Sequence, residues 1–123
     1  MFYNLIVKLM EPKKNCNLCS RLFDLRNKNK ILFPDFYNDR VLGTGPLDSK
    51  LLIIGLAPGL RGANRTGKIF NGDFSGNILF RFLKKYNITI NYDKFYEINN
   101  IRCRITNAVK CLPPNNKPTT KSP

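Results

Sequence analysis

The sequence predicts an α/β fold on a short parallel sheet, and three observations lead to that class. The apolar run at residues 51–55 ends in glycine before a proline, which is typical of a buried parallel strand. Apolar side chains at helical spacing follow over residues 75–86, with Ser75 as the expected N-cap. Residues 105–109 form a second strand-like run. Strand, helix and strand make a βαβ unit, whose right-handed crossover makes the two strands parallel.

The predicted helix has one apolar face, which is expected to pack in the core and consists of Ile78, Leu79, Phe82 and Leu83. Residues 1–10 are predicted to be a first strand or helix, and residues 31–50 to be irregular. Residues 87–104 are predicted to connect the helix to the second strand, with no secondary structure assigned to them. Four prolines by the end of the sequence exclude helix from the segment that follows Cys111.

The composition favours a polyanionic partner. The sequence has 123 residues, which allows one domain at most, and its 21 Lys and Arg against 8 Asp and Glu give a net charge of +13. Ribosomal-type proteins, membrane-surface proteins and lysine-rich solvated surfaces give the same excess, so the charge alone leaves these alternatives open. No apolar run reaches 18 residues and no signal peptide stands at the N-terminus, so we expect a cytoplasmic monomer without a membrane partner.

The four cysteines indicate metal or redox chemistry, because an unexported chain seldom forms disulfides. Cys16 and Cys19 have the spacing that grips one metal or cluster, although an incidental pair remains the alternative. If the chain between Cys103 and Cys111 is extended, they lie roughly 26 Å apart, so one compact centre cannot use both. We favour Cys111, at the carboxyl end of the strand, and expect Cys103 to be a buried structural thiol. The sequence has no histidine, so this chain alone cannot run a mechanism that needs imidazole.

The loop at residues 56–75 lies on the same predicted rim as the segment after Val109, because parallel strands present their carboxyl ends to a ligand. Its glycines allow a close backbone approach. Phe70 is placed to stack on a base, and the cations expected to meet phosphates are Arg61, Arg65 and Lys68. A solvated basic loop and a nucleotide-phosphate loop are the alternatives, although the sequence matches neither a P-loop nor a dinucleotide motif.

Asn107 lies inside the otherwise apolar second strand, where a side-chain amide needs partners. Two interpretations are open. The amide bonds to neighbouring backbone, or it recognises a pyrimidine edge with its donor and acceptor.

These motifs together resemble one family, the iron–sulfur uracil-DNA glycosylases, and within it the type-5 rather than the type-4 group. The resemblance covers nearly the whole chain in order. The stretches that carry it are Cys16-x-x-Cys19, residues 52–59, residues 62–67, Phe70-x-Gly-Asp73, residues 105–114 and Asn116-Lys-Pro118.

The resemblance implies a three-layer α/β/α sandwich with a structural [4Fe–4S] cluster, which Cys16, Cys19 and Cys111 would help to hold. The implied reaction is hydrolysis of the bond that joins uracil to deoxyribose in DNA, after the base has left the stack. Phe70 would stack on the flipped uracil and Asn107 would read its edge.

Four further positions follow from the same resemblance. Backbone at Leu56 and Ala57 would line the uracil pocket, and Asn64 would help to place the attacking water. Asp73 would assist the water or start the following helix. Many relatives outside type 5 carry an acidic or amide residue at the position of Leu56 and Ala57, and its absence here suggests a broader tolerance for deaminated bases.

Family members continue beyond the proline-rich loop with a fourth cysteine, further strands and a His-Pro-Ser-type motif. We therefore expect residues 1–123 to be the N-terminal portion of a single domain, without its C-terminal strands. The alternatives are a truncated gene product, a fragment, or half of a split protein that a separate C-terminal fragment complements. We also expect this chain alone to release little uracil and to bind iron weakly. A non-catalytic iron–sulfur nucleic-acid-binding module and a small redox protein are the competing hypotheses.

Overall fold

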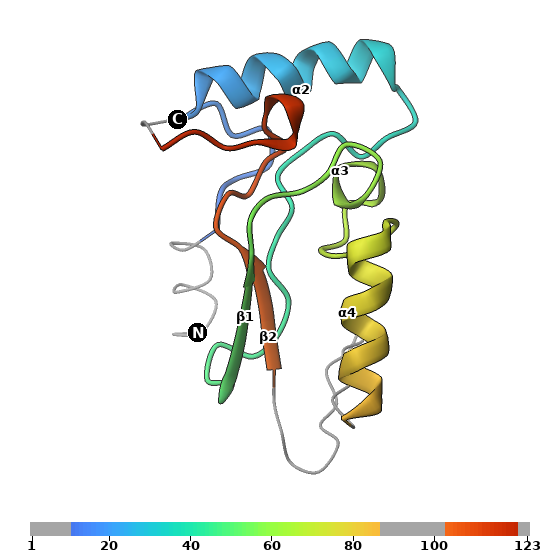
Figure 1. The fold of residues 1–123 in the computed structure, drawn as a ribbon. Coiled ribbons are helices and arrows are strands. Elements are labelled where there is room, and N and C mark those ends of the chain that lie inside the picture. Colours follow the sequence, from blue (N-terminus) through green and yellow to red (C-terminus); the bar gives the residue numbers. More distant parts are fainter. Residues whose placement is uncertain (1–10, 87–102, 121–123) are drawn as a thin grey trace.

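The computed structural model describes residues 11–86 and 103–120. In these residues a two-stranded parallel sheet lies beside helices, which confirms the α/β class (Figure 1). The predictions for residues 1–10 and 87–102 fall outside the described residues. In chain order the elements are α2 (Ser20–Leu32), β1 (Leu51–Gly55), α3 (Ala63–Thr66), α4 (Phe74–Lys85), β2 (Cys103–Asn107) and the 3-10 turn η1 (Pro114–Asn116).

The two strands pair in parallel along their whole length. The register begins at Leu51 opposite Cys103 and ends at Gly55 opposite Asn107. On its other edge β2 receives Thr44, whose backbone exchanges hydrogen bonds of 2.8 and 2.7 Å with Ile105. The irregular segment predicted for residues 31–50 is confirmed, apart from the end of α2 and this single bridge.

Strand β2 begins and ends two residues earlier than the apolar pattern predicted. Cys103, Ile105 and Asn107 are buried and alternate with half-exposed residues, as expected for a strand with one covered face. The prediction placed the start too late because Arg104 breaks the apolar run. Its guanidinium lies 3.0 Å from Glu11, which satisfies the charge at the sheet surface.

Helix α4 begins at Phe74, and the expectation that Ser75 caps it was wrong. Asp73 is the N-cap, and its Oδ1 accepts a hydrogen bond of 2.9 Å from the backbone amide of Gly76. An aspartate at this position satisfies an amide that has no partner inside the helix. Ser75 is the second helical residue and lies on the surface.

Helix α2 was not predicted, because its buried positions do not follow an apolar pattern. The residues that it buries are Leu22, Arg26 and Asn29, two of which are polar. The turn η1 was also missed, since the prolines around it exclude only a longer helix. None of the helices in the described ranges has the length and hydropathy required to cross a membrane.

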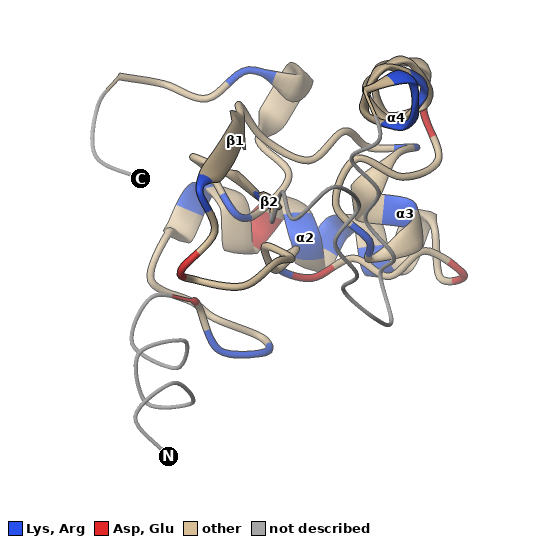
Figure 2. Cartoon of the chain, turned by 90° about the horizontal axis from the view of Figure 1, so that it is seen from below, with Lys and Arg blue, Asp and Glu red and all other residues tan. Residues whose placement is uncertain are grey.

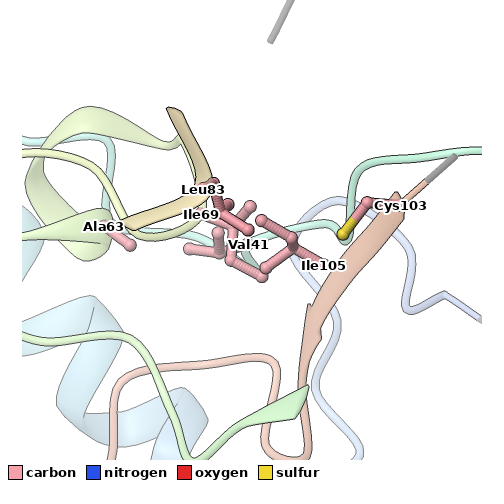
Figure 3. Close-up of a cluster of buried hydrophobic side chains, with 6 residues drawn as sticks. All are labelled: Val41, Ala63, Ile69, Leu83, Cys103 and Ile105. Atoms are coloured by element: carbon pink, nitrogen blue, oxygen red, sulfur yellow. The ribbon is translucent and has the colours of Figure 1, made fainter. Parts of the chain in front are cut away.

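The core joins the sheet, α4 and the loop before it (Figure 3), and its buried cluster consists of Val41, Ala63, Ile69, Leu83, Cys103 and Ile105. Leu79 and Phe80 pack against this cluster, as Leu79 was predicted to do. Phe82 does not, because 52% of it is exposed, so its predicted core role was wrong. The opposite face of β1 exposes Leu52 and Ile54.

Replacement of Ile105 by alanine is expected to lower the free energy of unfolding by about 2–5 kcal/mol, because Ile105 is fully buried and leaves a cavity. The matched control is Ile54→Ala in the neighbouring strand, where 60% of the side chain is exposed. That change is expected to cost less than about 1 kcal/mol. Urea denaturation followed by circular dichroism measures both values, and equal losses would show that the core is assigned incorrectly.

Candidate functional site

A cavity of about 230 Å³ lies at the carboxyl ends of the two strands, where parallel sheets bind ligands. It is formed by the loop after β1, the last residue of β2 and the start of α4. Five residues singled out from the sequence line it, namely Leu56, Ala57, Phe70, Asp73 and Asn107. The fold therefore brings together residues that are up to 51 positions apart in the sequence (56 to 107).

Gly55 makes the room in which two of these residues meet. A Cβ atom at position 55 would overlap both Oδ1 of Asn107 and the ring of Phe70. The ring and the amide therefore lie against the same glycine, at the last pair of the sheet register. Any side chain at this position would displace one of them from the cavity.

Phe70 is held in a backbone conformation that side chains seldom adopt, with φ of 51°. Its carbonyl lies so close to Gly76 that a Cβ there would collide with it. The first turn of α4 thus fixes the backbone of Phe70, and the ring is directed at the cavity.

Asn107 is buried, with 3% of its surface exposed. Within the described residues its side-chain amide makes no hydrogen bond to another residue. A buried amide ordinarily has partners. The amide lines the cavity and offers one donor group and one acceptor to a ligand there.

Asp73 uses its two carboxylate oxygens differently. Oδ1 caps α4 through Gly76, which realises the helix-start role considered from the sequence. Oδ2 lies against Gly62, where a Cβ atom would overlap it, and close to Gly59. The cap thus fixes the carboxylate and leaves its second oxygen between Gly62 and Gly59, of which Gly59 lines the cavity.

The structure does not bring Asn64 to the cavity. Asn64 is 2% exposed, and its Nδ2 donates a hydrogen bond of 3.0 Å to Oδ1 of Asn38. Asn38 in turn donates to the carbonyl of Phe33 at 2.8 Å, just after α2. This position links α3 to the end of α2, so the expectation that Asn64 places the attacking water has no geometric support.

The three cations expected to meet phosphates are exposed and lie outside the cavity. Arg61 stands over the ring of Phe33, 5.4 Å from its centroid. Arg65 donates to the carbonyls of Arg61 and Gly72 at 2.7 and 3.3 Å, so it also braces the loop before α4. Figure 2 shows further basic residues on α2 and α4.

A second cavity, of about 290 Å³ and mainly apolar, is lined by the three thiols of Cys16, Cys19 and Cys111. The start of α2 and the segment after β2 lie side by side there (Figure 1). The described side chains do not form a ready site for a single metal ion. Cys103 lies in the core at the other end of β2, and burial raises the pKa of its thiol.

Arg26 is a buried residue beside this cavity that the sequence did not single out. It is 4% exposed, and its Nη1 donates to Sγ of Cys111 at 3.6 Å. Its Nη2 donates to the carbonyl of Cys16, and Asp39 forms an ion pair with it at 3.6 Å. No signal in the sequence pointed to it, because Arg26 shares its helix face with Leu22 and Asn29, and this face has no apolar pattern.

Cys111 carries a perturbed thiol. Burial raises its pKa, the Arg26 guanidinium lowers it, and the neighbouring Cys16 and Cys19 raise it again. A metal centre at this position would displace the proton, because metals bind the thiolate.

The comparison with protein families defines the class of this chain. Residues 42–122 match the model of the uracil DNA glycosylase superfamily, and this range contains both strands and the whole 230 Å³ cavity. The chain therefore belongs to the uracil DNA glycosylase superfamily.

Within that superfamily the chain is similar to proteins named type-5 uracil-DNA glycosylases. The protein from Mycobacterium leprae is 39% identical over 113 residues, which are 85% of this chain and 49% of that protein. The protein from Pyrobaculum aerophilum is 36% identical over 117 residues, which are 87% of this chain and 50% of that protein. The protein from Thermus thermophilus is 34% identical over 111 residues, covering 85% of this chain and 51% of that protein. The chain thus spans about half the length of the curated relatives that it matches.

The geometry at Asp73 makes a prediction about stability. Asp73→Ala removes the cap of α4 and is expected to lower the free energy of unfolding by about 1 kcal/mol. Asp73→Asn keeps an acceptor oxygen at the N-cap and is expected to stay within a few tenths of that value from the unchanged protein. Thermal and urea melts compare the two variants. An equal loss in both would show that the carboxylate is needed for more than the cap.

Proposed function

We propose that the cavity at the strand ends binds a uracil flipped out of DNA, and that the chain acts in hydrolysis of its N-glycosidic bond during base-excision repair. The observation that carries the proposal is the meeting of the Phe70 ring and the Asn107 amide over Gly55. The superfamily membership of the chain and the names of its relatives support the same reaction.

The cavity walls suit a pyrimidine. Phe70 offers a face on which a base stacks. Asn107 offers a carbonyl oxygen to the N3–H of uracil and an N–H to its O4. Leu56 and Ala57 line another part of the wall and bring no charge to the base. Because that wall carries neither a carboxylate nor an amide, we propose that other deaminated bases are also accepted.

The chemistry assigned to Asp73 follows from Oδ2, which the cap does not use. Among the described residues that line the cavity, it is the one with an ionisable side chain. In the proposed step the bond between C1′ and N1 of uracil breaks and the base leaves with the bonding electrons. A water held by Oδ2 adds to C1′ and gives its proton to the carboxylate. The base leaves as the uracil anion and takes a proton from solvent, and the carboxylate returns its proton to solvent, so that free uracil and an abasic site are formed. Asn64 contributes by holding α3 in place rather than by touching the water.

We further propose that Arg61 and Lys68 contact DNA phosphates. Both are exposed, and the net charge of +13 favours association with DNA. Arg65 is assigned mainly to the loop that it braces.

We propose a [4Fe–4S] cluster at Cys16, Cys19 and Cys111. The three thiols come from two distant segments and surround one cavity. A cluster holds its thiolates farther apart than a single ion does, so the lack of a ready single-ion site does not count against it. The fourth ligand is not Cys103, which lies in the core. When bound, the cluster would tie the start of α2 to the segment after β2.

Removal of the carboxylate that is proposed to act as general base is expected to slow the reaction strongly. Asp73→Asn should lower the rate of uracil release by at least about 100-fold, the usual contribution of a general base, while the cap keeps the fold. The assay measures cleavage at the abasic site in duplex DNA that carries one uracil opposite guanine. Release at the unchanged rate would remove Asp73 from the mechanism. DNA binding without any uracil release by the unsubstituted protein would favour the non-catalytic iron–sulfur module instead.

The aromatic wall has a matched control four residues away. Phe70→Ala is expected to weaken binding of uracil-containing DNA by at least about tenfold, since base stacking contributes about 1–3 kcal/mol. Phe74→Ala should leave binding unchanged, because 76% of Phe74 is exposed and it does not line the cavity. Fluorescence anisotropy with uncleavable 2′-fluorinated deoxyuridine measures both. Equal affinities would contradict the proposed stacking.

Cys103, the first residue of β2, and Cys111, in the segment after it, distinguish the core from the proposed metal centre. After anaerobic reconstitution with iron and sulfide, Cys111→Ala is expected to lose most of the bound iron and the brown absorbance. Cys103→Ala should retain both, although the lost core contacts lower its stability. Iron and acid-labile sulfide analyses give the result. Retention of the cluster by Cys111→Ala would contradict the proposed ligand set.

A further inference from the structure

We infer that Arg26 is the buried counter-charge of the proposed iron–sulfur cluster and sets its reduction potential, because its guanidinium contacts both of the segments that carry the cysteines. The inference rests on the proposed cluster. It concerns a residue that lies outside the cavity lining and outside the set of ligands.

Arg26 contacts both segments that carry the proposed ligands, the one with Cys16 and the one with Cys111. One of its nitrogens donates to the sulfur of Cys111 at 3.6 Å, and another donates to the backbone carbonyl of Cys16. The side chain is 4% exposed, so the charge lies in a region that water screens weakly. A positive charge at this place acts on whatever charge the thiolates and the cluster carry.

Within the described ranges, the Arg26 guanidinium has fewer hydrogen-bond acceptors around it than it has N–H groups to donate. Its Nε is buried and has no hydrogen-bond partner among the described residues. Its one anionic partner, Asp39, also accepts backbone amides from Asn15 at 3.1 Å and from Arg40 at 2.7 Å. A buried cation with so few acceptors is costly unless negative charge lies nearby. Thiolates that hold a cluster supply that negative charge.

Asp39 fixes both Arg26 and the approach to Cys16. Its carboxylate is 4% exposed and bonds the amide of Asn15, the residue just before Cys16. Lys30, one turn further along α2 than Arg26, donates to the side chain of Asn15 at 3.0 Å. The first cysteine segment is therefore positioned on α2 by charged groups that also determine the local field.

The sign of the effect follows from charge. One-electron reduction adds a negative charge to the centre, and a nearby cation stabilises the reduced form more than the oxidised form. Loss of Arg26 should favour the oxidised form by at least tenfold, which is about 59 mV for one electron. Loss of the negative charge of Asp39 should move the potential in the opposite direction.

The test is a redox titration of the reconstituted full chain, with dithionite as the reductant and the cluster spectrum as the signal. Arg26→Gln removes the charge, Arg26→Lys keeps it, and Asp39→Asn removes the opposing charge. Lys28→Gln is the matched control, since it removes an exposed cation from the same helix. We expect the reduction potential of Arg26→Gln to be lower than that of the unsubstituted chain, and the potential of Asp39→Asn to be higher. Arg26→Lys and Lys28→Gln should both keep a potential near that of the unsubstituted chain.

The outcomes separate this inference from the proposed cluster. An unsubstituted chain that holds no iron and sulfide overturns the cluster and, with it, the role of Arg26. A loaded chain whose potential is the same in Arg26→Gln and Asp39→Asn overturns the role of Arg26 alone. Shifts of one sign in both variants indicate a merely structural ion pair and also overturn it. Cluster loss in Arg26→Gln, with retention in Arg26→Lys, supports the inference because the two differ in charge.

Discussion

The site depends on the absence of a side chain at Gly55. This glycine closes the parallel register opposite Asn107. Its missing Cβ lets the ring of Phe70 and the amide of Asn107 approach the same point. The cavity is thus an outcome of strand pairing, because a shift of one residue in the register would turn Asn107 to the opposite face.

The two proposed centres are joined through the end of β2. Beyond Asn107 the backbone stays bonded to the loop after β1, because Ala108 donates to the carbonyl of Gly55 at 2.9 Å and Val109 to that of Leu56 at 3.0 Å. Two residues further on, Cys111 reaches the thiol cavity. A cluster that restrains Cys111 would therefore also restrain the wall on which a base would rest, without touching the base.

The sequence predicted the parts of the fold that obey simple periodicity. Strand β1 has the predicted bounds because its apolar run is continuous and ends at glycine. The residues around the cavity were found because glycines, an aromatic and a buried amide stand out from their neighbours. Helix α2 and the position of Asn64 escaped prediction, because both depend on buried polar partners such as Asn38, which no periodic pattern reveals.

Helix α2 is held to the rest of the chain mainly by polar contacts, so a metal centre bound at its start would add to the stability of that attachment. Its last apolar residues, Ile31 and Leu32, are exposed, while Arg26 and Asn29 are buried. Such a helix gains little from the hydrophobic effect, and hydrogen bonds and ion pairs contribute modest net free energy. Cys19 stands at the N-cap of α2, where the partial positive charge of the helix end favours an anionic ligand. A cluster bound there would supply, through metal–thiolate bonds to Cys111, the cohesion that the apolar core does not extend to α2.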